Sequence, residues 1–165
     1  MLTHIVSRQG VSATRSNGFT LIEAMVVVAL VAILAALAAP SFSTTIANQR
    51  VSSASQELQT LLQFARAEAV YKRTESSVTA TGQTWAAKVG TQVLRETVLP
   101  DAVSVVPGSA GGVVFEVSGA ARPASGSPPY TLMLSAAQAS RAQCLSVTRT
   151  GLVRQKKVAA GQDCF

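Results

Sequence analysis

The chain has 165 residues, of which 48% are hydrophobic and 13% are charged, and its formal net charge is +6. This length accommodates one hydrophobic core outside any membrane segment, but not two. Two cysteines and the single histidine His4 are too few for a tetrahedral zinc site, and they form no Cys-x-x-Cys redox motif. Catalysis by serine or cysteine usually needs a nearby base, and His4 is the only histidine that could serve as one. A glycine-rich phosphate loop is also missing from the sequence. The composition therefore predicts no enzyme, no metal site and no cofactor.

Near the N-terminus, an apolar run over residues 19–39 is interrupted only by Thr20 and Glu23. At about 1.5 Å per residue, a helix of this length can cross the roughly 30 Å hydrocarbon core of a bilayer. Two arginines and no acid precede the run, whereas the nearest cation after it is Arg50. The positive-inside rule therefore predicts a transmembrane helix with residues 1–18 in the cytoplasm and the remainder outside.

The glycine beside this run stands in an unusual place. A secretory signal is cut after its apolar stretch, whereas Gly18 comes before it. The string GFTLIEAMVVVALVAILAALAAPSF closely resembles the leader junction of type IV pilins and type II secretion pseudopilins. In those proteins a prepilin peptidase cuts after the glycine and methylates the new N-terminal residue. The resemblance implies a leader, residues 1–18, cleavage between Gly18 and Phe19, and a mature chain that begins with N-methylated Phe19.

Glu23 is an acid within the membrane-length segment, where insertion scales put the cost of a charge at about 2.5 to 3.5 kcal/mol. Cleavage creates a cationic partner, because the new amine of Phe19 lies one helical turn from Glu23 and recurs on every neighbouring subunit. In the pilin family this acid is thought to match the amine of the adjacent subunit during assembly. The alternative is a carboxylate near the helix end that extends to the lipid headgroups.

Beyond the apolar run, apolar residues recur at intervals of three and four, which predicts an amphipathic helix. Its predicted apolar face consists of Ile46, Val51, Ala54, Leu58, Leu61, Ala65 and Ala69. We expect one helix from about Phe19 to near Tyr71. Residues 19–39 would form its transmembrane half, and residues 40–73 its amphipathic half, which packs against the domain that follows.

After Thr74 the sequence changes to short runs rich in β-branched residues, separated by Gly, Pro and Ser. The predicted strands are 76–80, 84–89, 91–98, 102–106, 111–117, 130–135 and 144–158. The Pro-rich segment 121–129 predicts a loop. A helix laid across an antiparallel sheet buries one face of each, so we expect an α+β fold, a pilin-like lollipop. Residues 74–165 would form its β-rich head, which makes one globular domain with residues 40–73.

Beyond the leader junction the chain resembles the GspH/FimT family of minor pilins and pseudopilins. The strings that carry this resemblance are LLQFARAEAVYKR, VVFEVSGA and CLSVTRTGLVR, together with Trp85. The resemblance implies a structural subunit in the inner membrane, with its C-terminal domain in the periplasm. It would assemble with other pilins or pseudopilins through the stem helix. Whether it serves a type IV pilus or a type II secretion pseudopilus stays open.

Cys144 and Cys164 are the only cysteines in the chain. A domain delivered outside the inner membrane lies in an oxidising compartment, where a disulfide is favoured over two free thiols. We therefore expect these two residues to form a disulfide that closes the C-terminal strands into a loop.

DNA binding is the alternative function. Some FimT-like minor pilins capture DNA during natural transformation through a Gly-Arg-x-Arg motif in the C-terminal strand region. The corresponding string here is GLVR at 151–154, so the first arginine of that motif is absent. The remaining candidates for phosphate contacts are Arg149, Arg154, Lys156 and Lys157. The competing interpretation is a solvated basic edge strand that opposes aggregation.

Overall fold

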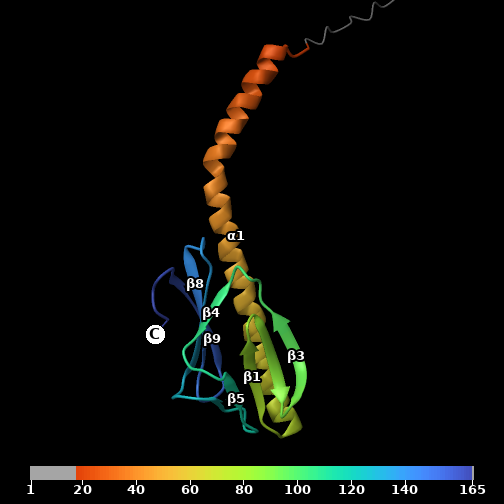
Figure 1. Cartoon of the computed structure of the whole chain (residues 1–165), viewed down its shortest axis with the longest axis vertical. Helices are drawn as coiled ribbons and strands as arrows, with labels where there is room; N and C mark the ends of the chain where they lie inside the picture. Colours follow the sequence, from red (N-terminus) through yellow and green to blue (C-terminus); the bar gives the residue numbers. More distant parts are fainter. Residues whose placement is uncertain (1–17, 165) are drawn as a thin grey trace, which may run out of the picture. The chain divides into compact units, whose positions relative to one another are not determined.

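The computed structural model describes residues 18–164, and within this range the chain forms one helix followed by nine strands (Figure 1). The predicted leader lies outside the described residues except for Gly18. The chain divides into two compact units, Met1–Ala39 and Pro40–Phe165. The first contains the N-terminal half of the helix, and the second contains its C-terminal half and all nine strands.

The helix α1 spans Leu21–Lys72, close to the predicted bounds. At its start, the hydroxyl of Thr20 accepts a hydrogen bond from the backbone N–H of Glu23 at 3.2 Å, which is an N-cap. At its end, Arg73 has a left-handed φ of 52°, and the N–H of Thr74 donates to the carbonyl of Ala69 at 3.2 Å. This pattern is a Schellman cap, and it stops the helix before the first strand.

The segment Leu21–Ala38 is a candidate membrane span of 18 residues with a mean hydropathy of 2.8. None of its residues is buried within the protein. A core helix of a soluble protein would bury an apolar face, whereas this segment leaves every side chain exposed. The structure therefore contains the candidate transmembrane helix that the sequence predicts.

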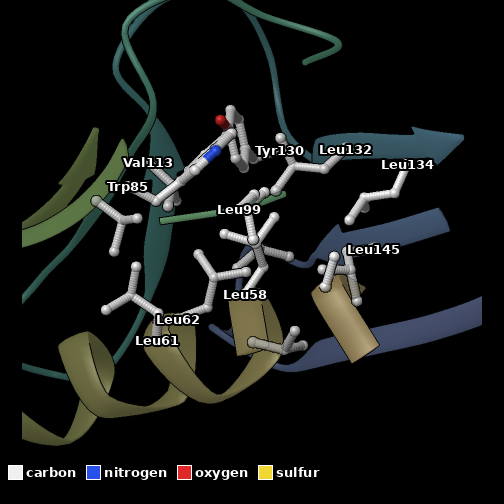
Figure 2. Packing of buried hydrophobic residues seen from close by; sticks show 14 of the residues in the cluster. Leu58, Leu61, Leu62, Trp85, Leu99, Val113, Tyr130, Leu132, Leu134 and Leu145 are labelled. Atoms are coloured by element: carbon white, nitrogen blue, oxygen red, sulfur yellow. The ribbon is translucent and has the colours of Figure 1, made fainter. Parts of the chain in front are cut away.

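The C-terminal half of α1 supplies one wall of the hydrophobic core (Figure 2). The buried residues of the predicted face are Val51, Ala54, Leu58, Leu61, Ala65 and Ala69, and Leu62 is buried with them. The prediction for Ile46 is wrong, because Ile46 is 51% exposed and Ala47 is buried in its place. At about 100° per residue, Ala47 lies four positions before Val51 on the same face, whereas Ile46 is turned about 140° away.

Two antiparallel sheets complete the core where the sequence analysis expected one. The five-stranded sheet has the order β3-β2-β1-β5-β6, and the four-stranded sheet has the order β4-β7-β8-β9. The strands are β1 Ser76–Thr81, β2 Thr84–Val89, β3 Gln92–Val98, β4 Ser104–Pro107, β5 Val113–Phe115, β6 Ala121–Pro123, β7 Tyr130–Ser135, β8 Arg141–Val147 and β9 Val153–Ala159. The fold is α+β, as predicted.

Two local predictions in the sheets are wrong. The segment 121–129 begins with the strand β6, which pairs with β5 and matches Ala121 to Phe115. Three residues are too few for an alternating pattern to stand out in the sequence. The predicted long strand 144–158 is a hairpin, because β8 and β9 are joined by a turn that contains Gly151 with φ 76°.

The aromatic residues Trp85 and Tyr130 lie in the core with Leu99 and Leu132 above α1 (Figure 2). Trp85 is 3% exposed and is therefore a core residue. Burial raises the pKa of Tyr130 to about 12, so its hydroxyl stays protonated at physiological pH. These rings join the two sheets and α1 into one packed unit.

Candidate functional site

The predicted cleavage junction lies just before α1. Gly18 and Phe19 are both exposed, and a Cβ placed on Gly18 would meet no heavy atom within 4 Å. Its φ is also outside the left-handed region that favours glycine. Within the described part of the chain, therefore, neither packing nor backbone conformation requires a glycine at position 18.

Glu23 occupies the third helical position of α1, and its backbone N–H is the group that Thr20 caps. The N–H of Ala24 donates to the carbonyl of Thr20 at 3.2 Å, which is the first hydrogen bond of the helix. Among residues 18–164, the carboxylate of Glu23 takes part in no ion pair. The sequence analysis missed Thr20, although a threonine three positions before a glutamate is the signature of a capping box.

The four candidate DNA-binding cations are distributed along the hairpin of β8 and β9. Arg154 pairs with Ser146 across the strands and Lys156 with Cys144, whereas Lys157 pairs with Gln143. Because successive side chains of a strand point to opposite faces, Arg154 and Lys156 share one face and Lys157 lies on the other. Arg149 is in the turn. All four are exposed and, among the described residues, form no ion pair.

The turn between β8 and β9 is held against α1 by Arg66. The Arg66 Nε donates to the carbonyl of Gly119 at 3.0 Å, and its Nη2 donates to the carbonyl of Thr150 at 3.2 Å. The N–H of Ala121 also donates to the carbonyl of Arg149 at 2.9 Å. This role of Arg66 could not be predicted from the sequence, because its partners are 53 and 84 positions away along the chain.

Beside this turn lies an open groove of about 530 Å³. Its lining residues are Gln63, Arg66, Ala67, Val70, Tyr71, Gly151, Leu152 and Val153. Two of its apolar residues are largely exposed, Tyr71 at 83% and Leu152 at 46%. Leu152 occupies the position of the first arginine in the DNA-binding motif, so the groove has an apolar border where that motif has a cation.

Replacing Gly151 with alanine should destabilise the hairpin. A Cβ at this position would meet the carbonyl oxygen of Gly119 and the Nε of Arg66, and the left-handed φ adds about 1 to 2 kcal/mol of strain. We expect Gly151→Ala to lose about 2 kcal/mol or more of unfolding free energy. Gly161→Ala is the matched control, because Gly161 has φ 81° and open space around it. Equal losses in urea unfolding of the two variants would contradict the steric argument.

A disulfide joins Cys144 in β8 to Cys164, with a Cα–Cα distance of 5.6 Å and a sequence separation of 20 residues. This is the predicted pair. It fastens the C-terminal segment to the face of the four-stranded sheet on which Lys156 lies, because Lys156 is the cross-strand partner of Cys144. Cys144 and Cys164 are both buried, which limits access of reductants to the bond.

Removing this disulfide should lower stability without changing the fold. A closed loop of this size contributes roughly 3 kcal/mol in the chain-entropy model, so Cys144→Ala with Cys164→Ala should unfold at correspondingly lower denaturant. Whether the bond forms in the cell is measured separately, by thiol labelling of the denatured, unreduced parent protein after periplasmic expression. Modification of both cysteines in that sample would show that the bond does not form in the cell.

The chain matches the models of two known families. A model of the family described as Type II transport protein GspH matches residues 54–151, which is more than half of the chain. The chain belongs to the GspH family. A model of the prokaryotic N-terminal methylation motif also matches residues 13–39, which include the glycine junction and the apolar half of α1. No curated protein sequence matches this GspH-family chain.

Two solved structures share the fold of this GspH-family protein. The type IV minor pilin FimU of Pseudomonas aeruginosa PAO1 has a TM-score of 0.57 and 22% identity, covering 66% of this chain and 89% of FimU. The minor pseudopilin EpsH from the type 2 secretion system of Vibrio cholerae has a TM-score of 0.54 and 14% identity, covering 68% of this chain and 99% of EpsH. At these identities the likeness shows the fold alone. Family and fold together make this protein a minor pilin or pseudopilin, a structural subunit.

Proposed function

We propose that this protein is a minor subunit that primes, or is incorporated into, a type IV pilus or a type II secretion pseudopilus. In this proposal prepilin peptidase cleaves between Gly18 and Phe19 and methylates Phe19. The observation that carries it is the match to the methylation motif, which leads directly into an apolar span with every side chain exposed. Cleavage before the span retains it, and its exposed side chains are free to contact lipid or the helices of other subunits.

We also propose that the protein is held in the inner membrane with the unit Pro40–Phe165 in the periplasm. Two observations support this orientation. The arginines of the N-terminal segment favour a cytoplasmic location for residues 1–18. The disulfide between Cys144 and Cys164 is of a kind that forms in oxidising compartments such as the periplasm.

Deleting the gene tests the proposal and distinguishes the two machines. Loss of surface pili with normal export of type II substrates would assign the subunit to the pilus, and the reverse result would assign it to the pseudopilus. Complementation with the intact gene should restore the lost function. A deletion strain that retains both wild-type pili and wild-type secretion would contradict the proposal.

DNA binding is the second candidate function, and one observation favours it. Arg154 and Lys156 project from the same face of β9, which is an edge strand, and among the described residues neither is neutralised by an acid. Such cations are available to DNA phosphates, which they would contact without reading the base sequence. Because Lys157 lies on the other face, only two of the three cations of β9 are available to one duplex along the strand.

Binding to duplex DNA should therefore be weak and salt-dependent. Four phosphate contacts would give a slope of log K against log salt near −3.6, and the two cations of one face about −1.8. Arg154→Gln with Lys156→Gln should flatten the slope, whereas Lys72→Gln with Arg73→Gln at the end of α1 should change it less. Gel shifts across a salt series measure this. If the double variant of β9 binds DNA as tightly as the parent at every salt concentration, Arg154 and Lys156 are excluded as the DNA-binding site.

A further inference from the structure

A polar hollow of about 360 Å³ lies between α1 and the end of the β8–β9 hairpin that is away from the turn. Six of its lining residues carry the argument: Asn48, Ser52, Ser140, Arg141, Gln143 and Lys157. All of them belong to the unit Pro40–Phe165, so the hollow is formed within one compact unit. We call it the Gln143 hollow.

The walls of the Gln143 hollow are fixed to each other by Asn48. The Asn48 Nδ2 donates to Ser140 Oγ at 3.1 Å, and the backbone N–H of Arg141 donates to Asn48 Oδ1 at 3.2 Å. Both ends of the Asn48 amide therefore hold the start of β8 against α1. Arg141 uses only its backbone in this contact, so its exposed guanidinium remains available to a ligand.

Gln143 supplies a hydrogen-bond donor from within the protein. It is 4% exposed and shares the core-facing side of β8 with Leu145, two positions farther along the strand. Its Oε1 accepts a hydrogen bond from Gln155 Nε2 at 3.1 Å, whereas its Nε2 has no hydrogen-bond partner among residues 18–164. Buried amide groups are almost always hydrogen-bonded. Because Gln143 lines the hollow, a ligand bound there can accept this missing hydrogen bond.

The charge of the Gln143 hollow favours an anion. Arg141 and Lys157 line it and form no ion pair within the described part of the chain, and no acidic residue lines it. Lys157 is the cross-strand partner of Gln143, so both side chains lie on the same face of the sheet. A guanidinium, an ammonium and neutral donors are the groups that bind carboxylate and phosphate oxygens.

The adjoining hollow is less suited to an anion. It has a volume of about 580 Å³ and shares Arg141 and Lys157 with the Gln143 hollow, but it is also lined by Lys156 and Asp163. The carboxylate of Asp163 repels an anion there, and no buried donor lines this second hollow. Protection of Lys157 without Lys156 therefore distinguishes an anion in the Gln143 hollow from one in its neighbour.

We propose that the Gln143 hollow binds an oxyanion, either the carboxylate of an acidic side chain of another protein or a free phosphate ion. Arg141 and Lys157 supply the charge, and Gln143 Nε2 supplies a directed hydrogen bond. The proposal goes beyond the proposed function and depends on neither membrane anchoring nor DNA binding. The candidate DNA contacts Arg154 and Lys156 lie on the opposite face of β9.

The test labels the amines of the full chain in micelles of neutral dodecyl maltoside. The chain has four lysines, Lys72, Lys88, Lys156 and Lys157, which mass spectrometry can follow separately. Inorganic phosphate at about four times its dissociation constant leaves about one site in five free, so labelling of Lys157 should slow about fivefold. The other three lysines should react at unchanged rates. Sodium chloride keeps the ionic strength constant, so that screening does not change.

Three variants test the groups of the Gln143 hollow. Gln143→Glu places a carboxylate where the anion binds, so labelling of Lys157 should no longer depend on phosphate. Arg141→Gln should weaken phosphate binding roughly two- to fivefold, the range for an exposed ion pair. Arg154→Gln is the matched control, because it removes the same charge from the opposite face and should not weaken binding. Arg141 is exposed, so its variant tests the proposal even if Gln143→Glu does not fold.

A second series with acetate distinguishes the two sources of the oxyanion. Protection of Lys157 by both anions would support a carboxylate ligand, and protection by phosphate alone would support a phosphate ion. Equal protection of Lys156 and Lys157, or protection of neither, would overturn the proposal. So would an Arg141→Gln variant that binds phosphate as tightly as the parent. None of these results bears on the proposed function, which the gene deletion tests separately.

Discussion

A Gly18→Leu variant is expected to stay at full length in cells that contain a prepilin peptidase, whereas the parent chain is shortened to a form that begins at Phe19. The fold gives no reason for a glycine at this position, since a Cβ there would meet nothing within 4 Å. In the proposed function the requirement comes from the peptidase that reads the junction, and the expected effect is a complete loss of processing. Intact-mass measurement of the membrane fraction distinguishes the two forms.

The control for this variant is the fold itself. Gly18 lies outside the unit Pro40–Phe165, so Gly18→Leu should form the same Cys144–Cys164 disulfide and unfold at the same denaturant concentration as the parent. If the variant is unprocessed but has the same disulfide and the same unfolding midpoint as the parent, the defect lies in cleavage. Normal processing of Gly18→Leu, or a mature parent chain that begins anywhere other than Phe19, would remove the basis of the proposed processing.

The long elements of the fold could be predicted because their patterns are local and repeated. The bounds predicted for α1 differ from the observed Leu21–Lys72 by one or two residues, since a membrane-length apolar run defines its first half and a helical period of apolar residues defines its second half. The division into two sheets could not be predicted, because it depends on which strands pair. Strand β1 pairs with β5 and strand β4 with β7, and these pairings arise from contacts that no local pattern encodes.

The candidate sites also differ in whether the sequence could predict them. The junction at Gly18 is a contiguous motif, so the sequence carries it in full. Arg66 donates hydrogen bonds to Gly119, 53 positions away, and to Thr150 in the turn of the hairpin, 84 positions away, and a helix-surface arginine carries no signal of such partners. The separation of Arg154 and Lys156 from Lys157 follows from strand alternation in any strand that contains residues 154–157, so the sequence alone was sufficient to predict it.

Glu23→Ala should insert into the membrane and be cleaved, but should be lost from filaments. Removing the acid lowers the cost of insertion, by about 2.5 to 3.5 kcal/mol at the centre of a bilayer and less near its edge, so anchoring should not suffer. Incorporation should fail because the amine of a neighbouring Phe19 would have no acid to match. The measurement is the amount of mature chain that copurifies with sheared pili or pseudopili, relative to the amount in the membrane.

The structure supplies a competing explanation for such a defect, because Glu23 is also the third residue of a helix capped by Thr20. Two further variants separate the roles. Glu23→Gln keeps a side chain that suits a capping box but removes the charge, and Thr20→Ala keeps the charge but removes a cap worth about 1 kcal/mol. If charge matching governs assembly, Glu23→Gln should be as defective as Glu23→Ala, and Thr20→Ala should assemble. If Glu23→Gln enters filaments like the parent, charge matching is excluded, and Glu23 acts by capping the first turn of α1.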